Sequence, residues 1–199
     1  MAEQKSRKNR LPRTKTPEEW ARLFRSINAR YDTQARNHAV LYLAYVAALR
    51  IGETVALQTA DLDLDRLRLH VRDGKTGERN VPLPDEAELR ASLSRWLVVR
   101  EKWGVDSLLL FVTKAGAPLH PNAVRRSMEV YGERSGLGHV APHMLRHSAA
   151  TELLANGASP IGVQRVLGHR RLSTTLDVYA SASDTHAAEA MGKRFGPRS

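Results

Sequence analysis

Most of the chain spaces its apolar residues as helices do, and one short stretch alternates apolar and polar residues instead. The run AVLYLAYVAAL lies in a predicted helix over about 33–48, and it is apolar enough to form the buried centre of the fold. The alternating stretch RLRLHVRDGKTGERNVPLP turns through DGKTG and predicts a β-hairpin. The pattern therefore predicts a mostly α fold with one small antiparallel β-sheet (α+β).

Further helices are expected on both sides of the hairpin. In TPEEW, Thr16, Pro17 and Glu19 form a capping-box pattern at the start of a helix that we expect to run to about Ala29. The segment LLLFV at 108–112 is short and apolar, which indicates a strand or a buried extended segment. The other predicted helices cover residues 52–57, 85–102, 121–135, 142–155, 160–167 and 184–195.

We expect one folded domain with an extension at each end. Residues 1–15 carry six Lys or Arg and almost no apolar side chain. They predict a basic flexible arm, which either keeps the protein in solution or touches phosphate. The folded domain is predicted to span residues 16–182, and residues 183–199 to form a C-terminal helix and tail.

The overall charge indicates a polyanionic partner. The chain has 199 residues, and 31 Lys or Arg against 21 Asp or Glu give a formal net charge of +10. Such a surplus is typical of proteins that bind nucleic acid, although some proteins are basic without binding it. The absence of cysteine excludes disulfides, thiolate metal sites and a cysteine nucleophile. No apolar run reaches the roughly 20 residues of a membrane span, so we expect a cytoplasmic protein that acts on DNA.

Six polar groups could share one chemistry, although each also has an ordinary structural explanation, such as a helix-end charge or a solvated turn lysine. Transfer of a phosphodiester needs a nucleophile, stabilisation of charge on the non-bridging oxygens and an acid for the leaving oxygen. No carboxylate cluster for metal ions is evident, but guanidinium groups can hold phosphate oxygens in their place. A tyrosine hydroxyl is a competent nucleophile. The six groups are Arg50, Lys75, His143, Arg146, His169 and Tyr179.

The motifs around these groups resemble those of the tyrosine recombinases, also called phage-type integrases. ALRIGE resembles the first arginine box, GKTGERNVPLP the β-hairpin lysine, and HMLRH the His-x-x-Arg box. LGH resembles the second histidine motif and TTLDVY the nucleophile motif. The ordered set covers about residues 16–185, which makes it much more specific than any single motif. The resemblance implies the catalytic-domain fold of that family.

The resemblance also implies a mechanism. Tyr179 attacks the scissile phosphate and leaves a 3′-phosphotyrosyl link, while Arg50 and Arg146 hold the non-bridging oxygens. Lys75 protonates the departing 5′-oxygen, and His143 and His169 add hydrogen bonds, His143 also taking the tyrosine proton. Two residues have supporting roles: Glu53 orients Arg50 from one helical turn away, and His147 is a supporting rather than a reactive group. No metal or other cofactor is implied.

Two features depart from the family pattern. Ala48 stands where the family often has Gly before the Leu-Arg of the first box, which we interpret as a small change within a helix. The second departure is that a basic arm stands where most members carry a core-binding domain of about 100 residues. The chain is therefore either a natural minimal enzyme, which the initial Met1 favours, or a catalytic domain cut from a longer protein. The absence of that domain puts tight, independent site recognition in doubt.

The partners implied are double-stranded DNA and further copies of the chain, assembled on DNA as a tetramer, with accessory DNA-bending proteins as possible additions. The predicted C-terminal helix either docks on a neighbouring copy, as is common in the family, or packs on its own domain. Two other functions stay open at this point. One is relaxation of DNA in the manner of a type IB topoisomerase, and the other is DNA binding without catalysis by a protein of the same fold.

Overall fold

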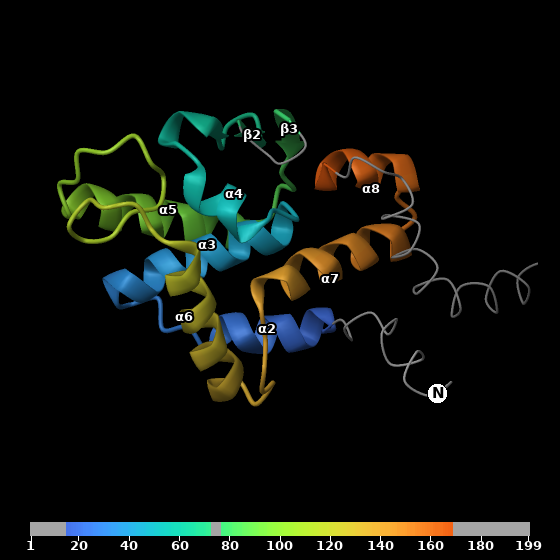
Figure 1. Cartoon of the computed structure of the whole chain (residues 1–199), viewed down its shortest axis with the longest axis horizontal. Coiled ribbons are helices and arrows are strands. Elements are labelled where there is room, and N and C mark those ends of the chain that lie inside the picture. The colour runs from blue at the N-terminus through green and yellow to red at the C-terminus, as the bar shows by residue number, and fades with distance from the viewer. Residues whose placement is uncertain (1–14, 73–76, 169–199) are drawn as a thin grey trace, which may run out of the picture.

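The computed structural model describes residues 15–72 and 77–168 (Figure 1). Within them the chain forms seven α-helices, one 3-10 turn and one three-stranded antiparallel sheet, which confirms the predicted mostly α fold with a small sheet. The helices are α2 (Pro17–Arg25), α3 (Asp32–Val46), α4 (Ile51–Ala56), α5 (Ala87–Lys102), α6 (Pro121–Arg134), α7 (Pro142–Ala155) and α8 (Pro160–Leu167). The 3-10 turn is η2 (Thr59–Asp61), and the strands are β1 (Leu62–Asp63), β2 (Arg68–Val71) and β3 (Arg79–Pro82).

Helix α3 is the centre of the fold, as its apolar sequence predicts. Every residue from Ala35 to Ala44 is buried, and the helix packs against α4, α5, α6 and α7. In Figure 1 it crosses the middle of the molecule, with α2 and α7 on one side and α4 and the hairpin on the other. A second, smaller apolar cluster joins α7 and α8 to the end of α3 through Ala48, Ala149, Ala150, Leu154, Val163 and Leu167. This cluster fixes the end of α3 relative to α7 and α8.

The predicted hairpin is formed by β2 and β3, and its register explains the alternation in the sequence. Leu69 pairs with Val81, and both side chains are buried, whereas Arg68 and Pro82 form an exposed pair. The structure adds β1, in which Leu62 pairs with Leu69. A two-residue strand is too short to show alternation, so no sequence pattern predicts it.

The first helix is shorter than predicted. Helix α2 begins at the predicted capping box, with Thr16 and Glu19 each bonding the other's backbone N–H, but it ends at Arg25 rather than near Ala29. The side chain of Asn28 accepts a hydrogen bond from the Arg30 N–H and its carbonyl accepts one from the Tyr31 N–H. A side chain that serves a local turn in this way competes with the helix, which explains the early end.

The end of α3 corrects the interpretation of Ala48, which does not lie within a helix. Helix α3 ends at Val46, and Ala48 has φ 51°, in the left-handed region. The Ala48 N–H donates to the Tyr45 carbonyl and the Leu49 N–H to the Ala44 carbonyl, a Schellman pair that closes the helix. Glycine is the residue that takes this conformation at least cost. A Gly at this position would therefore serve the turn, and Ala48 adopts the turn despite its Cβ.

The remaining boundaries lie close to the predicted ones. Helix α7 and helix α8 begin and end at the predicted residues, α6 ends one residue earlier, and α5 begins at Ala87 rather than at residue 85. In the segment 108–112, Leu109 forms an isolated bridge with Gln58 and Val112 one with Pro118, and the chain bends at the other three residues. Leu110, Phe111 and Val112 are buried, whereas Leu108 is 77% exposed. The predicted helix over 184–195 lies outside the described residues. Among the helices of the described part, none is both long and apolar enough to cross a membrane.

Candidate active site

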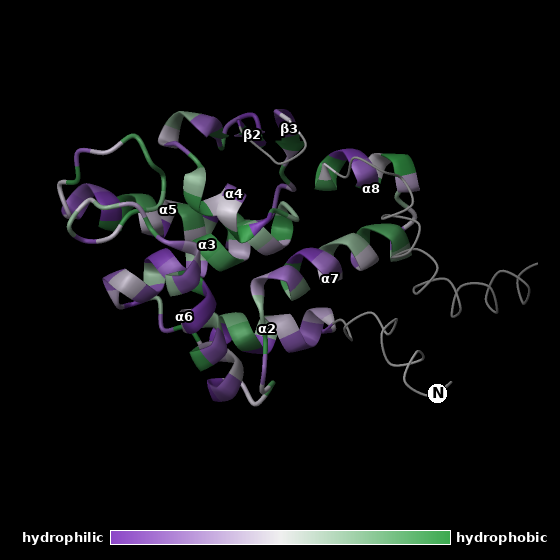
Figure 2. Ribbon diagram, in the orientation of Figure 1, coloured by the Kyte–Doolittle hydropathy of each residue, from purple (hydrophilic) through white to green (hydrophobic). Residues whose placement is uncertain are grey.

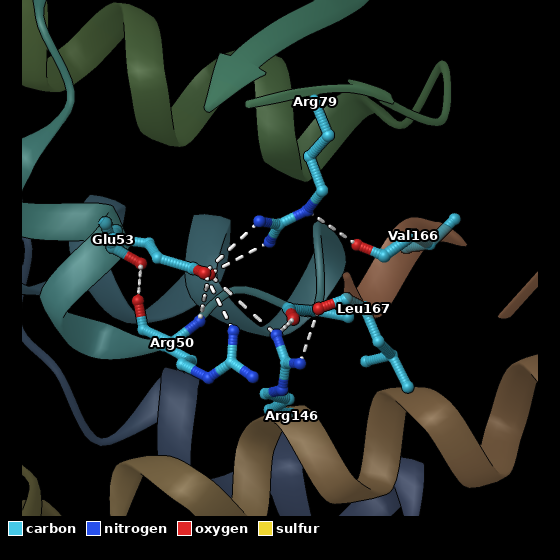
Figure 3. Close-up of polar contacts among 8 residues, drawn as sticks. Arg50, Glu53, Arg79, Arg146, Val166 and Leu167 are labelled. Carbon is cyan, nitrogen blue, oxygen red and sulfur yellow. Dashed lines mark hydrogen bonds and ion pairs between the residues drawn. The ribbon is translucent and has the colours of Figure 1, made fainter. Parts of the chain in front are cut away.

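The site is built around the buried carboxylate of Glu53, in the first turn of α4. Its oxygens accept hydrogen bonds from the backbone N–H of Arg50 at 2.9 Å and from Arg50 Nη1 at 2.9 Å. Arg79 adds two more, from Nη1 at 3.2 Å and Nη2 at 2.9 Å. Figure 3 shows the guanidinium groups of Arg50, Arg79 and Arg146 converging on this carboxylate from three different elements. One negative charge therefore organises three positive ones.

Arg50 occupies the N-cap of α4, directly after the turn that closes α3. The neighbouring Leu49 is 1% exposed and anchors the turn in the core. The Arg50 side chain is 35% exposed, whereas the side chains of Arg79 and Arg146 are 10% and 11% exposed. Arg50 is therefore the member of the trio most open to a ligand.

Arg146 lies near the start of α7 and is held mostly by backbone carbonyls. Nη1 donates to the Ala48 carbonyl at 2.8 Å, and Nη2 donates to the Leu167 carbonyl at 2.6 Å. Nη1 also lies 3.8 Å from Glu53 Oε2. Burial, together with the nearby charge of Arg50, lowers the pKa of Arg146 to about 10. The group is still protonated at neutral pH, so it contributes a full positive charge.

The carboxylate stays ionised despite its burial. Burial by itself raises the pKa of Glu53, but the hydrogen bonds from Arg79 and from the Arg50 backbone, with the Arg79 charge, outweigh it and lower that pKa overall. Three guanidinium groups against one carboxylate leave a surplus of two positive charges. In a partly dry setting, such a surplus favours an anion beside the exposed Arg50.

The two histidines of HMLRH lie on the same helix as Arg146, in its polar first half (Figure 2). His143 is exposed, and His147 is half-buried. Burial and the neighbouring His143 lower the pKa of His147, so its imidazole is neutral at physiological pH. On the apolar face of α7, Leu145, Ala149 and Leu154 are buried, and Leu153 is partly buried.

The structure thus brings together Arg50, Glu53 and Arg146 of the predicted set. Lys75, His169 and Tyr179 lie outside the described residues. Two of them lie close in the sequence to residues of the cluster. Lys75 comes four residues before Arg79, the first residue of β3, and His169 comes two residues after Leu167, whose carbonyl accepts a hydrogen bond from Arg146.

Arg79 is a residue of the site that the sequence motifs did not indicate. It sits between Glu78 and Asn80 in a hairpin and reads as a solvated strand residue. Its guanidinium is instead 10% exposed, bonded to Glu53 and, through Nε, to the Val166 carbonyl at 3.1 Å. One signal could have found it: Arg79 is two residues before Val81, so the period of a strand places it on the inward face.

The profile of the phage integrase family matches residues 14–186. The chain belongs to the phage integrase family. This member is 35% identical over 158 residues to tyrosine recombinase XerC of Corynebacterium glutamicum, covering 79% of this chain and 50% of that protein. It is 37% identical over 181 residues to XerC of Chromobacterium violaceum, covering 90% and 59%. The chain therefore spans about half to three fifths of the length of these relatives.

A solved structure shows the same fold. The XerH site-specific recombinase bound to a palindromic difH substrate, in a post-cleavage complex, superimposes with a TM-score of 0.79 at 27% identity, covering 92% of this chain and 54% of that one. The fold is therefore that of a tyrosine recombinase catalytic domain, as the sequence motifs imply. Within residues 15–72 and 77–168 of this family member, no group of three or more His, Asp or Glu side chains is placed to hold a metal ion.

Proposed function

We propose that this chain is a site-specific DNA recombinase that cleaves and rejoins strands through a 3′-phosphotyrosyl intermediate. The observation that carries the proposal is the trio of guanidinium groups around one buried carboxylate, with Arg50 open to a ligand. Guanidinium donors match the paired non-bridging oxygens of a phosphodiester. The surplus charge of this cluster and the formal +10 of the chain favour the same polyanion.

In the proposed reaction the Tyr179 oxygen attacks phosphorus as the bond from phosphorus to the 5′-oxygen breaks. His143 takes the phenolic proton, and Lys75 gives a proton to the departing 5′-oxygen. Arg50 and Arg146 bind the non-bridging oxygens, where charge builds up in the transition state, and His169 adds a hydrogen bond. Attack by the 5′-hydroxyl of another strand reverses these steps. The phosphotyrosyl link keeps the bond energy, so rejoining consumes no further reagent.

The relatives support this reaction and this partner. They are named tyrosine recombinases, and the XerH structure holds a DNA substrate after cleavage. These names do not favour type IB topoisomerase activity or a silent DNA-binding protein. We extend the proposal to assembly of a tetramer on two DNA sites, with accessory DNA-bending proteins as possible partners. In a two-site assay, recombinant product with little relaxation of supercoils would separate a recombinase from a topoisomerase.

The decisive experiment is covalent trapping on a nicked suicide substrate. The wild-type chain should form a covalent protein–DNA adduct, and Tyr179→Phe should form none while binding DNA almost equally well, because one hydroxyl adds little to a contact dominated by phosphate charge. Tyr31→Phe is a matched control, since Tyr31 is 64% exposed and its hydroxyl has no role in the proposal. A covalent adduct with Tyr179→Phe would refute Tyr179 as the nucleophile, and failure of wild type on cognate DNA would refute the reaction.

A further inference from the structure

We propose that Arg79 is a positioning residue that sets the phosphate-binding geometry of Arg50 through their shared carboxylate, Glu53. The inference rests on the function proposed above and adds a residue to it. Arg79 comes from the hairpin, whereas Arg50 and Glu53 come from α4, so the tertiary fold alone brings them together (Figure 3).

The contacts of Arg79 are those of a clamp. Its two terminal nitrogens bind both oxygens of Glu53, and its Nε binds the Val166 carbonyl in the last turn of α8. This use of the planar fork fixes the plane of the carboxylate, which a single ammonium group cannot do. The Glu53 oxygens then hold the Arg50 backbone N–H and Nη1.

Hydrogen bonding separates the role of Arg79 from that of Arg50. In Arg79, Nε donates to the Val166 carbonyl and both Nη1 and Nη2 donate to Glu53, so all three guanidinium nitrogens are engaged. In Arg50, Nη1 donates to Glu53, and the side chain is 35% exposed. A phosphate that reaches Arg50 is therefore held by Arg50, with Arg79 acting on it only through Glu53.

Loss of the clamp has a defined consequence at Arg50. Without Arg79, Glu53 loses two of the four hydrogen bonds that fix the plane of its carboxylate. Its carboxylate can then turn, and Arg50 either follows it or pairs with it more closely instead of with phosphate. The variant should therefore be slow in cleaving substrates whose non-bridging oxygens are charged. A better leaving group at the 5′ position should not restore its rate.

Three substrates, each cleaved by the full chain, distinguish an effect on the non-bridging oxygens from an effect on the leaving 5′-oxygen. The first is a normal phosphodiester, the second carries a methylphosphonate that removes the non-bridging charge, and the third carries a 5′-bridging sulfur that leaves without protonation. Arg79→Gln should slow cleavage of the normal linkage by about 10- to 100-fold, a size common for residues that orient a binding group. On the methylphosphonate, the cleavage rate of the same variant should lie within about 3-fold of the wild-type rate, because the remaining non-bridging oxygen carries little charge for Arg50 to stabilise.

Controls keep a folding defect apart from a positioning defect. Arg90→Gln removes an arginine that also pairs with a carboxylate, Asp85, and donates to a carbonyl, that of Leu64, without contacting Glu53. It should cleave all three substrates at similar relative rates to wild type. If Arg79→Gln does not fold, Arg79→Lys is the second variant, because it keeps the positive charge but not the planar guanidinium. It should likewise cleave the phosphodiester slowly and the methylphosphonate at nearly the wild-type rate.

Two results would overturn the inference. Equal defects on the phosphodiester and the methylphosphonate would mean that Arg79 only supports the fold, and rescue by the bridging sulfur would mean that it acts on the leaving group. If the wild-type chain itself gave no adduct on the phosphodiester, the proposed function would fail, and this inference would fail with it. A wild-type adduct together with either of the first two results would leave the proposed function standing.

Discussion

Arg146 donates a 2.8 Å hydrogen bond to the carbonyl of Ala48, a residue whose backbone adopts a left-handed conformation with φ 51°. The turn at Ala48 ends α3 and aims this carbonyl at the first half of α7. Ala48 is 0% exposed, so its methyl group is fully packed while its backbone conformation is strained. The position of one catalytic candidate therefore depends on the geometry of a helix end 98 residues earlier in the chain.

Substitutions at Ala48 should separate backbone strain from side-chain packing. Ala48→Gly relieves left-handed strain of about 1–2 kcal/mol. It also loses a buried methyl worth about 0.8 kcal/mol and adds chain entropy of about 0.5–1 kcal/mol to the unfolded state. The free energy of unfolding in urea should therefore change by less than about 1 kcal/mol. Ala48→Val should lose about 2–4 kcal/mol, because a β-branched residue resists this φ and overfills the site. A loss above about 2 kcal/mol for Ala48→Gly would contradict the left-handed geometry.

Glu53→Gln should destabilise the fold by about 3–5 kcal/mol at neutral pH, because it leaves three guanidinium groups without their shared counter-charge. The folded pKa of Glu53 is lowered below its ordinary value of 4.5, so its ionic contribution is present above that value and is lost as the pH falls through the folded pKa. Urea unfolding of both proteins between pH 3 and pH 7 should show their difference shrinking below about pH 4.5. A difference that does not change with pH would mean that Glu53 acts through packing alone.

Lys75→Ala should slow cleavage of a normal phosphodiester and be rescued by a 5′-bridging sulfur. A thiolate leaves without a proton, so the acid is no longer needed. Single-turnover cleavage rates on the two substrates measure the effect, and Arg50→Ala is the comparison, since sulfur at the leaving position should not rescue it. Equal defects of the Lys75 variant on both substrates would show that Lys75 only helps to bind DNA.

Deletion of residues from Ser183 onward should separate cleavage from assembly. In the predicted C-terminal helix, Ala187, Ala188, Met191 and Phe195 share one face, and a helix this short needs an apolar surface to pack on. We propose that this surface belongs to a neighbouring copy on DNA. Suicide-substrate cleavage at one site should then persist, while complexes with two DNA sites and strand exchange are lost. Strand exchange at the full-length rate by the truncated chain would show that the helix packs on its own domain.

Local signals were enough for most of the elements. The prolines at 142 and 160 stand at the first position of α7 and α8, and Gly168, with φ 60°, ends α8, so these boundaries could be predicted from neighbouring residues alone. The hairpin followed from alternation, and the motifs around Arg50 and Arg146 indicated the family and its fold. The helix boundaries and the hairpin need only residues that are close together in the sequence, where spacing alone determines which side chains share a face. The family needs in addition the order of motifs spread over about residues 16–185.

Only the tertiary structure decided how the charged groups meet. Ala48 reads as one more residue of an apolar helix, and Arg79 as one more charge on a strand. The first turns left-handed because α3 must end where α7 and α8 pack against it, and the second is buried because the hairpin lies beside α4 and α8. A buried arginine is stable only where carboxylate and carbonyl partners converge on it. The strand period relative to Val81 places Arg79 on the inward face, but its partners come from residues 26 and 87 positions away, so no local pattern could identify them.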